Sequence, residues 1–138
     1  MANYLHKVHY YETDKMGITH HSNYIRWMEE ARIYFMDQIG FGYARMESEG
    51  IMSPVIGAEC DYKTSTTFDD LVEIKAEVEE YSGVKLKIKY TMTNADTKDI
   101  VAVGRTKHCF VSSEGRPIIL KKRFPQLDEK LKELADAE

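Results

Sequence analysis

The chain has 138 residues, of which 43% are hydrophobic and 30% charged, and its net charge is −4 at pH 7. This length suits a single globular domain over residues 1–138, with a core over about 4–123, that needs no disulfide or metal to fold. The negative charge disfavours general nucleic-acid binding, there is no 18-residue apolar run to span a membrane, and the N-terminus lacks a signal-peptide pattern, so we expect a cytoplasmic protein.

The N-terminal part predicts a strand followed by a long helix. Residues 4–11 have a strand-like aromatic pattern, and residues 12–17 form a polar loop. From Ser22, a suitable N-cap, apolar residues recur at helical spacing until Gly40 or Gly42 supplies a stop. The apolar positions are Tyr24, Trp27, Met28, Ala31, Phe35 and Ile39. So wide an apolar stripe indicates a helix that other elements cover.

The remainder of the chain predicts strands joined by short turns. Strict alternation of apolar and polar residues over 72–79 and 84–93 is typical of half-buried strands, with a hairpin at Ser82-Gly83 between them. Pro125 suits the first turn of a helix over about 125–136. Other strands are expected at 55–62, at 100–111 with both faces covered, and at a last segment that opens at 118–120.

This order of elements predicts an α+β fold. Consecutive hairpins make the sheet antiparallel, and the amphipathic helix must lie across one face of it. We therefore expect five to six strands curved around one long central helix. Cys60 and Cys109 fit no metal or redox spacing and are expected to be free thiols.

Residues 10–32, YYETDKMGITHHSNYIRWMEEAR, resemble the opening of the 4-hydroxybenzoyl-CoA thioesterase type of hotdog-fold acyl-CoA thioesterases. The matching elements are Asp14, Gly17, Asn23-Tyr24, Trp27, Glu30 and Ala31-Arg32. Later segments, 61–74 and 101–118, also resemble strands of that family. The resemblance covers about residues 8–120 and implies a hotdog fold, a homodimer or homotetramer, and acyl-CoA bound in clefts between protomers.

The resemblance also implies a catalytic site where the first strand leads into the helix. Asp14 would attack the thioester as nucleophile or deprotonate the attacking water, and the sequence leaves both roles open. The backbone N–H of His21, at the positive end of the helix, would donate to the oxyanion. Gly17 would allow a tight turn beside the acyl group.

Substrate-binding positions follow from the same resemblance. Ser82, Gly83, Val84 and Lys85 match the turn that holds the nucleotide phosphates of CoA, although relatives often have more basic residues there. Tyr24 is expected first to pack against the sheet and second to contact substrate. Adjacent His20 and His21 diverge by roughly 100° on a helix, so no metal site is expected, and no cofactor is implied.

Other interpretations remain open at this stage. Asp14 could instead cap a turn, and Trp27 and Met28 are expected to be core residues rather than pocket residues. Glu29 and Glu30 are expected to be solvated or structural. The main prediction is an acyl-CoA thioesterase, and the alternative is a non-catalytic hotdog module that binds acyl-CoA or acyl-carrier protein, because fold alone does not determine function.

Overall fold

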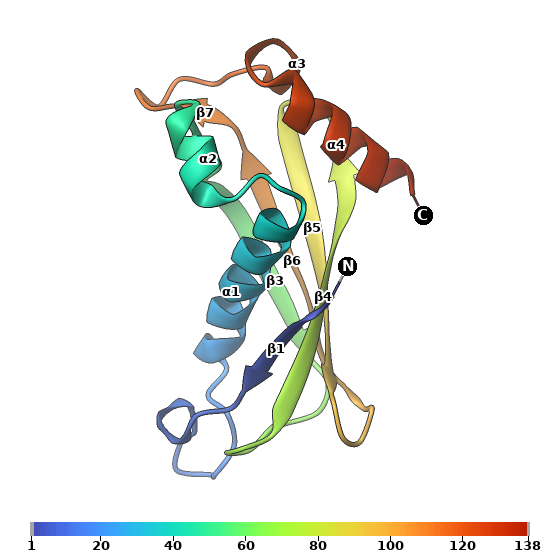
Figure 1. The fold of residues 1–138 in the computed structure, drawn as a ribbon. Coiled ribbons are helices and arrows are strands. Elements are labelled where there is room, and N and C mark those ends of the chain that lie inside the picture. The colour runs from blue at the N-terminus through green and yellow to red at the C-terminus, as the bar shows by residue number, and fades with distance from the viewer. Residues whose placement is uncertain (1, 138) are drawn as a thin grey trace.

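A computed structural model describes residues 2–137 and shows one curved antiparallel sheet wrapped around a long helix (Figure 1). The five strands lie in the order β1-β4-β5-β6-β3, and every neighbouring pair is antiparallel. The strands are β1 (Tyr4–Lys7), β3 (Val55–Tyr62), β4 (Leu71–Tyr81), β5 (Lys85–Asn94) and β6 (Ile100–Cys109). The predicted α+β class and the five-stranded sheet around one helix are confirmed.

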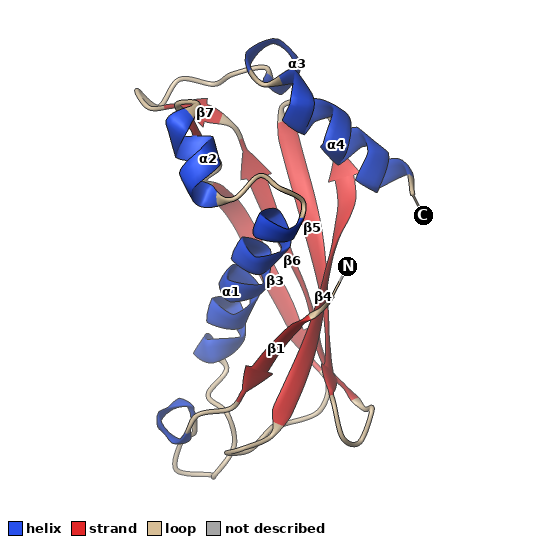
Figure 2. Cartoon of the chain, viewed as in Figure 1, coloured by secondary structure: helices blue, strands red, loops and turns tan. Residues whose placement is uncertain are grey.

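The helix α1 (Ser22–Gln38) fills the concave face of this sheet (Figure 2). Its apolar stripe is buried as predicted, with Trp27 and Met28 fully inaccessible to solvent. Strand β6 allows a close approach of the helix because Gly104 has no side chain: a Cβ atom at this position would collide with the sulfur of Met28. The hydrophobic core therefore lies between α1 and the inner faces of β4, β5 and β6.

Several smaller elements complete the chain. They are the 3-10 helix η1 (Tyr10–Glu12), α2 (Tyr43–Ser48), the paired short strands β2 (Ile51–Met52) and β7 (Val111–Ser112), α3 (Leu120–Arg123) and α4 (Pro125–Asp136). The predicted C-terminal helix is confirmed at its predicted bounds, and it buries Leu127 and Leu131 completely. None of the helices within residues 2–137 combines the length and the apolar character needed to cross a membrane.

Two local predictions were wrong, and one helix was missed. The first strand ends at Lys7 rather than at residue 11, because the chain turns into η1 and Glu12 becomes buried. The segment expected to open a last strand instead leads into α3, since Leu120 is fully buried as the start of a helical turn. Helix α2 was not predicted at all.

The sheet has two ends that matter for function. We call the end where β1 finishes and β4 begins the loop end, because it holds residues 8–21 and the start of α1. We call the opposite end, where β4 turns into β5 and β3 begins, the hairpin end. In Figure 1 the loop end is at the bottom and the hairpin end, with α3, is at the top.

Candidate active site

Asp14 lies in a small hairpin at the loop end. Thr13 and Thr19 form an antiparallel bridge, and the Asp14 N–H donates to the carbonyl of Ile18 at 2.9 Å. Gly17 closes the turn with φ +78°, a conformation that other residues rarely adopt, and its N–H donates to the Asp14 carbonyl at 3.0 Å. Nothing lies within 4 Å of a Cβ placed on Gly17, so the backbone angle, rather than crowding by neighbours, requires glycine.

The side chain of Asp14 is half-exposed and has one engaged oxygen. Its Oδ1 accepts a hydrogen bond from the Met16 N–H at 2.8 Å, which is the turn-capping contact considered as an alternative from the sequence. Within residues 2–137, no hydrogen bond engages the second carboxylate oxygen. Capping the turn therefore orients the carboxylate and still leaves one oxygen available for chemistry.

The start of α1 presents an unpaired donor. His21 precedes the first helical residue with φ −56° and ψ −27°, and within the described residues no acceptor pairs with its backbone N–H. A helix N-terminus also carries a partial positive charge. The imidazoles of His20 and His21 are exposed and stack with their ring centroids 4.3 Å apart.

Ser22 is not the N-cap that the sequence suggested. It is the first residue of α1, and its N–H donates to Nδ1 of His20 at 3.2 Å while its hydroxyl lies 2.9 Å from the same nitrogen. The imidazole of His20 therefore satisfies the first free amide of the helix. This assigns His20 a local structural contact at the edge of the site.

Two tyrosines surround the helix start. Tyr24 is buried, its hydroxyl lies 3.1 Å from Oγ1 of Thr66, and burial raises the pKa of its phenol. This geometry corresponds to the packing role that the sequence put first for Tyr24. Tyr62, which was not among the predicted site residues, is half-exposed and donates a long hydrogen bond of 3.4 Å to the carbonyl of His21.

Glu12 is a buried carboxylate two residues before Asp14, with 5% of its surface exposed. Its Oε1 accepts from the His9 N–H at 2.8 Å and lies 2.9 Å from Nε2 of His6, and its Oε2 accepts from Nε1 of Trp27 at 2.8 Å. Burial raises the pKa of Glu12, but these hydrogen bonds outweigh it and hold the pKa below its usual value. The sequence did not predict this network.

Within residues 2–137, one group of three potential metal ligands is found, and it belongs to this part of the chain. Ligand atoms of His6, His9 and Glu12 lie within 4.8 Å of one another. Both oxygens of Glu12, however, already accept from protein donors, and an ion would have to displace them. The geometry is that of a hydrogen-bonded network.

The predicted CoA-binding turn lies at the other end of the sheet. Ser82 and Gly83 form the β4–β5 hairpin, whose tip is closed by a hydrogen bond from the Ser82 N–H to the Lys85 carbonyl at 3.0 Å. The eleven residues of β4 separate this hairpin from the loop end. At about 3.3 Å per residue that is roughly 33 Å, so one protomer does not bring Ser82, Gly83, Val84 and Lys85 near Asp14.

A basic concavity borders this hairpin. It has a volume of about 520 Å³, and its lining includes Ser82 and the side chains of Lys85, Lys87 and Lys107. Lys87 lies opposite Lys107 on β6 and opposite Glu80 on β4, and Glu80 also lines the concavity, so its charged residues, three lysines and one glutamate, carry a net charge of +2. Lys107 was not among the predicted residues.

An apolar pocket of about 540 Å³ opens between the C-terminal half of α1, α2 and β2. Its walls are mainly apolar, and Glu29 and Arg32, joined by an ion pair of 2.7 Å, form its polar side. The apolar lining residues include Ile33, Met36, Phe41, Met46, Ile51 and Met52. The pocket lies at the hairpin end, where it is also remote from Asp14 of the same protomer.

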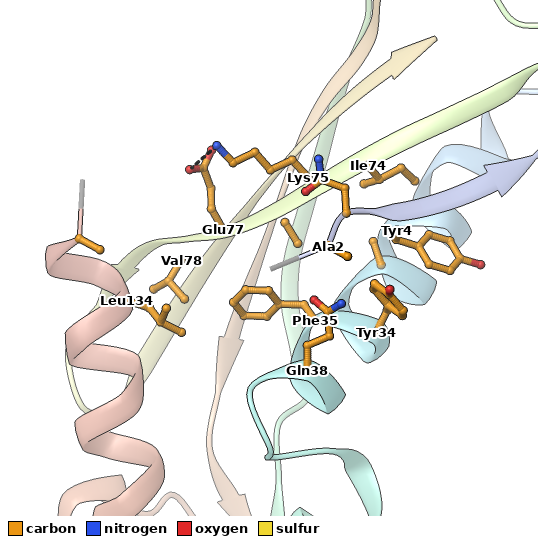
Figure 3. Close-up of a pocket in the computed structure, with 14 residues that line it drawn as sticks. Ala2, Tyr4, Tyr34, Phe35, Gln38, Ile74, Lys75, Glu77, Val78 and Leu134 are labelled. Atoms are coloured by element: carbon orange, nitrogen blue, oxygen red, sulfur yellow. Dashed lines mark ion pairs between the residues drawn. The ribbon is translucent and has the colours of Figure 1, made fainter. Parts of the chain in front are cut away.

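Figure 3 shows another pocket, of about 440 Å³, between the N-terminus, α1, β4 and α4. Tyr4, Tyr34 and Gln38 are among its lining residues, and an ion pair between Lys75 and Glu77 borders it. None of its lining residues belongs to the Asp14 loop or to the start of α1. We therefore do not associate it with the catalytic candidates.

Comparison with known proteins gives the family. The model of the thioesterase-like superfamily matches residues 8–134. A protein of Aquifex aeolicus, provisionally described as an esterase, is 39% identical over 110 residues, which are 80% of this chain and 84% of its own. The Bacillus subtilis protein YneP, provisionally described as an acyl-CoA thioesterase, is 32% identical over 119 residues, 86% of each chain.

Comparison with a solved structure points to the same family as these two relatives. The DHNA-CoA thioesterase of Staphylococcus aureus superposes with a TM-score of 0.90 and 34% identity, over 96% of this chain and 89% of its own. Its fold matches the sheet and central helix described above. The chain therefore belongs to the thioesterase-like superfamily, a hotdog-fold family of thioester hydrolases.

Proposed function

We propose that this protein hydrolyses an acyl-CoA thioester to the free acid and CoA, with Asp14 as the reacting carboxylate and the backbone N–H of His21 as oxyanion donor. One observation carries the proposal: Asp14, with one carboxylate oxygen free within residues 2–137, stands on the short Thr13–Thr19 hairpin, and two residues after that hairpin the His21 amide begins α1 with no acceptor among the same residues. Thioester hydrolysis needs both groups. The carboxylate supplies or activates the oxygen that attacks the carbonyl carbon, and the amide stabilises the negative charge that then develops on the carbonyl oxygen.

Two routes use these groups. In one, a carboxylate oxygen of Asp14 attacks the carbonyl carbon, the C–S bond breaks with CoA leaving as thiolate, and water hydrolyses the resulting mixed anhydride. In the other, Asp14 takes a proton from a water whose oxygen attacks the same carbon, and the departing thiolate is then protonated. In both, the His21 amide stabilises the oxyanion, and Gly17 sets the turn that presents Asp14.

Dimerisation through β3 is part of the proposal. This eight-residue strand ends the sheet, and within residues 2–137 its outer edge pairs with no other strand. Val55, Ile56 and Tyr62 are between 43% and 52% exposed along it. An open strand edge invites pairing with a second copy, and a two-fold axis closes such an assembly.

Antiparallel pairing of two β3 strands would complete the site. The Tyr62 end of one strand, beside His21, would lie next to the Val55 end of the other, which follows directly from the apolar pocket. The acyl group bound at Asp14 would then extend into the pocket of the partner protomer. The pocket's volume of about 540 Å³ suits a ring system or a chain of moderate length.

The same pairing would also bring the hairpin end of one protomer toward the loop end of the other. Ser82, Gly83, Val84 and Lys85 would then supply the CoA nucleotide site, with Lys87 and Lys107 adding positive charge. Three lysines acting as point charges suit the phosphates of CoA. A substrate reaching from this concavity to Asp14 would span two protomers. Tyr24 would act through packing, with any substrate contact secondary.

The relatives support acyl-CoA as the substrate class: the Staphylococcus aureus protein acts on DHNA-CoA, and YneP is described as acting on acyl-CoA. We accordingly expect aromatic acyl-CoA to be hydrolysed, and aliphatic acyl-CoA of moderate length to compete. Measuring the release of free thiol from acetyl-, hexanoyl-, palmitoyl-, benzoyl- and naphthoyl-CoA would rank these substrates.

The deciding experiment compares Asp14→Asn with Asp69→Asn on the best substrate of that panel. Asp69 is an exposed residue at the same loop end, and its substitution removes the same charge; within residues 2–137 its carboxylate pairs only with Lys7, at 3.2 Å. Asp14→Asn should lower kcat by about 10²–10⁴, and Asp69→Asn should stay within about twofold. Equal activity in both variants would remove Asp14 from the chemistry. Tight acyl-CoA binding without thiol release would identify a binding module instead.

A further inference from the structure

Glu12 joins three parts of the chain through its carboxylate. The donors are His6 on β1, the His9 amide that precedes η1, and the Trp27 indole on α1. A carboxylate at 5% exposure is costly unless its lone pairs are filled, and here three donors fill them. Glu12 thus ties the segment before the Asp14 hairpin to the middle of the long helix.

The backbone of Glu12 makes a second connection. Its carbonyl accepts from the His20 N–H at 2.8 Å and from Nδ2 of Asn23 at 3.0 Å. Nδ2 of the same buried asparagine also lies 3.2 Å from the carbonyl of His20. One residue therefore holds the chain on both sides of the hairpin: two residues before Asp14 and one residue before His21.

The tip of the hairpin has few contacts of its own. Lys15, Met16 and Gly17 are exposed, and Asp14 is half-exposed. Its direction is consequently fixed at its base, where Thr19 hydrogen-bonds Thr66 on one side and Glu12 holds the other. Catalysis by a positioned carboxylate and amide depends on such supporting contacts, because misplacement of about 1 Å can cost about 100-fold in rate.

We propose that Glu12 is a positioning residue for thioester hydrolysis: it holds the Asp14 carboxylate and the His21 amide in their mutual arrangement. This inference rests on the function proposed above. Glu12 is buried behind the hairpin and does not contact the substrate. Its removal should therefore affect the rate of the chemical step and leave CoA binding unchanged.

The test is Glu12→Gln, which keeps the size of the side chain and replaces one acceptor oxygen by an amide donor. The Trp27 indole and the His9 amide can only donate, so the new N–H finds an acceptor in this network only where His6 moves its proton to Nδ1 and accepts at Nε2. At a temperature where circular dichroism shows folded protein, kcat should fall about 10–100-fold at unchanged KM. Inhibition by free CoA should stay at the wild-type level.

The matched control is Asp128→Asn. Asp128 is a buried carboxylate at 4% exposure that accepts from the Tyr81 hydroxyl, and it lies on α4 at the hairpin end. Asp128→Asn should lower the melting temperature by about as much as Glu12→Gln does, and its kcat should stay within about twofold of the wild type. A purely structural role for Glu12 would instead give both variants the same kinetic profile.

A double variant separates this inference from the proposed function. If Glu12 acts through Asp14, then Glu12→Gln combined with Asp14→Asn should be no slower than Asp14→Asn alone. Wild-type kcat in Glu12→Gln, or effects that multiply in the double variant, would overturn the inference while leaving Asp14 in place. Full activity of Asp14→Asn would overturn the proposed function and the inference together.

Trp27→Phe provides a second route if Glu12→Gln does not fold. It removes the indole N–H that donates to Oε2, together with part of a fully buried ring system, and retains an aromatic ring in the core. We expect a smaller fall in kcat, about threefold to tenfold, again at unchanged KM. Unchanged kcat in this folded variant would count against a positioning role for the Glu12 network.

Discussion

At the scale of single residues, one buried side-chain nitrogen within residues 2–137 has no hydrogen-bond partner. Among the described residues, Nδ1 of His108 is the buried side-chain nitrogen that has no hydrogen bond, although its Nε2 lies 2.8 Å from Oγ1 of Thr106. The hydroxyl of Tyr90 lies 2.8 Å from the same oxygen. A fully buried imidazole is expensive to charge, so burial, helped by the nearby positive charge of Arg32, lowers the pKa of His108 to about 4.

This pKa gives a pH dependence with a defined sign. Below pH 6.5 the unfolded chain protonates His108, whereas the folded chain does so only below about 4. Because the unfolded state binds the additional proton, stability should fall as the pH drops from 6.5 to 4, by about 3 kcal/mol from this residue. Urea unfolding of His108→Gln across this range should show a slope smaller by up to about 1.4 kcal/mol per pH unit.

His9→Gln is the control for this measurement, because it makes the same substitution at an exposed histidine. The slope of His108→Gln should be smaller than that of His9→Gln. If His108→Gln and the wild type lose stability in parallel between pH 6.5 and 4, then His108 is protonated in the folded protein, which would contradict its burial as a neutral group.

At the scale of elements, the start of α1 gives a test of the oxyanion donor that side-chain changes cannot give. His21 has φ −56°, which a proline ring accepts, and its N–H has no acceptor within residues 2–137. His21→Pro therefore removes the proposed donor and breaks no observed hydrogen bond. We expect kcat to fall about 10²–10³, measured as thiol release from acyl-CoA.

His21→Ala completes that experiment, because it removes the imidazole and keeps the N–H. It should retain activity within a few-fold of the wild type. An inactive His21→Ala would assign the role to the side chain instead, and an active His21→Pro would exclude this amide as the donor.

The elements also show what a sequence can predict here. Strict alternation of apolar and polar residues was sufficient to predict β4 and β5, because each strand has one face on the core and one face in solvent. The first strand was extended too far because Tyr10 and Tyr11, interpreted as strand residues, belong to the 3-10 helix η1, where they are 76% and 79% exposed. Leu120 was assigned to a strand because three apolar residues have no detectable period.

For the candidate site, the resemblance identified Asp14, Gly17 and His21 as local neighbours in the chain. The Glu12 network was missed because its donors lie three to fifteen residues away and meet only after β1, η1 and α1 have packed. The separation of Ser82–Lys85 from Asp14 was missed for a related reason. It depends on which end of the sheet each loop occupies, and that is a property of the topology.

At the scale of the whole molecule, the proposed assembly predicts that activity depends on the free edge of β3. Ala58 is exposed near the middle of that strand, next to Glu59. In a two-fold antiparallel pair centred on the middle of β3, Ala58 of one copy would lie opposite Glu59 of the other, so Ala58→Glu would oppose like charges directly across the new interface. Wild-type protein should sediment at twice the mass of one chain, and Ala58→Glu should shift it toward one chain.

Activity should follow assembly in this variant, since an acyl pocket at one hairpin end would no longer reach Asp14 at the loop end of a partner. The same substitution at exposed Ala137, Ala137→Glu, adds the same charge at the C-terminal end of α4 and should change neither mass nor kcat. Analytical ultracentrifugation and thiol release on the same samples make the comparison. Suppose that wild-type protein sediments as one chain at micromolar concentration and is nevertheless fully active. The complete site would then lie within a single protomer. In that case Ser82–Lys85 would not belong to it, because the length of β4 places this hairpin roughly 33 Å from the loop end.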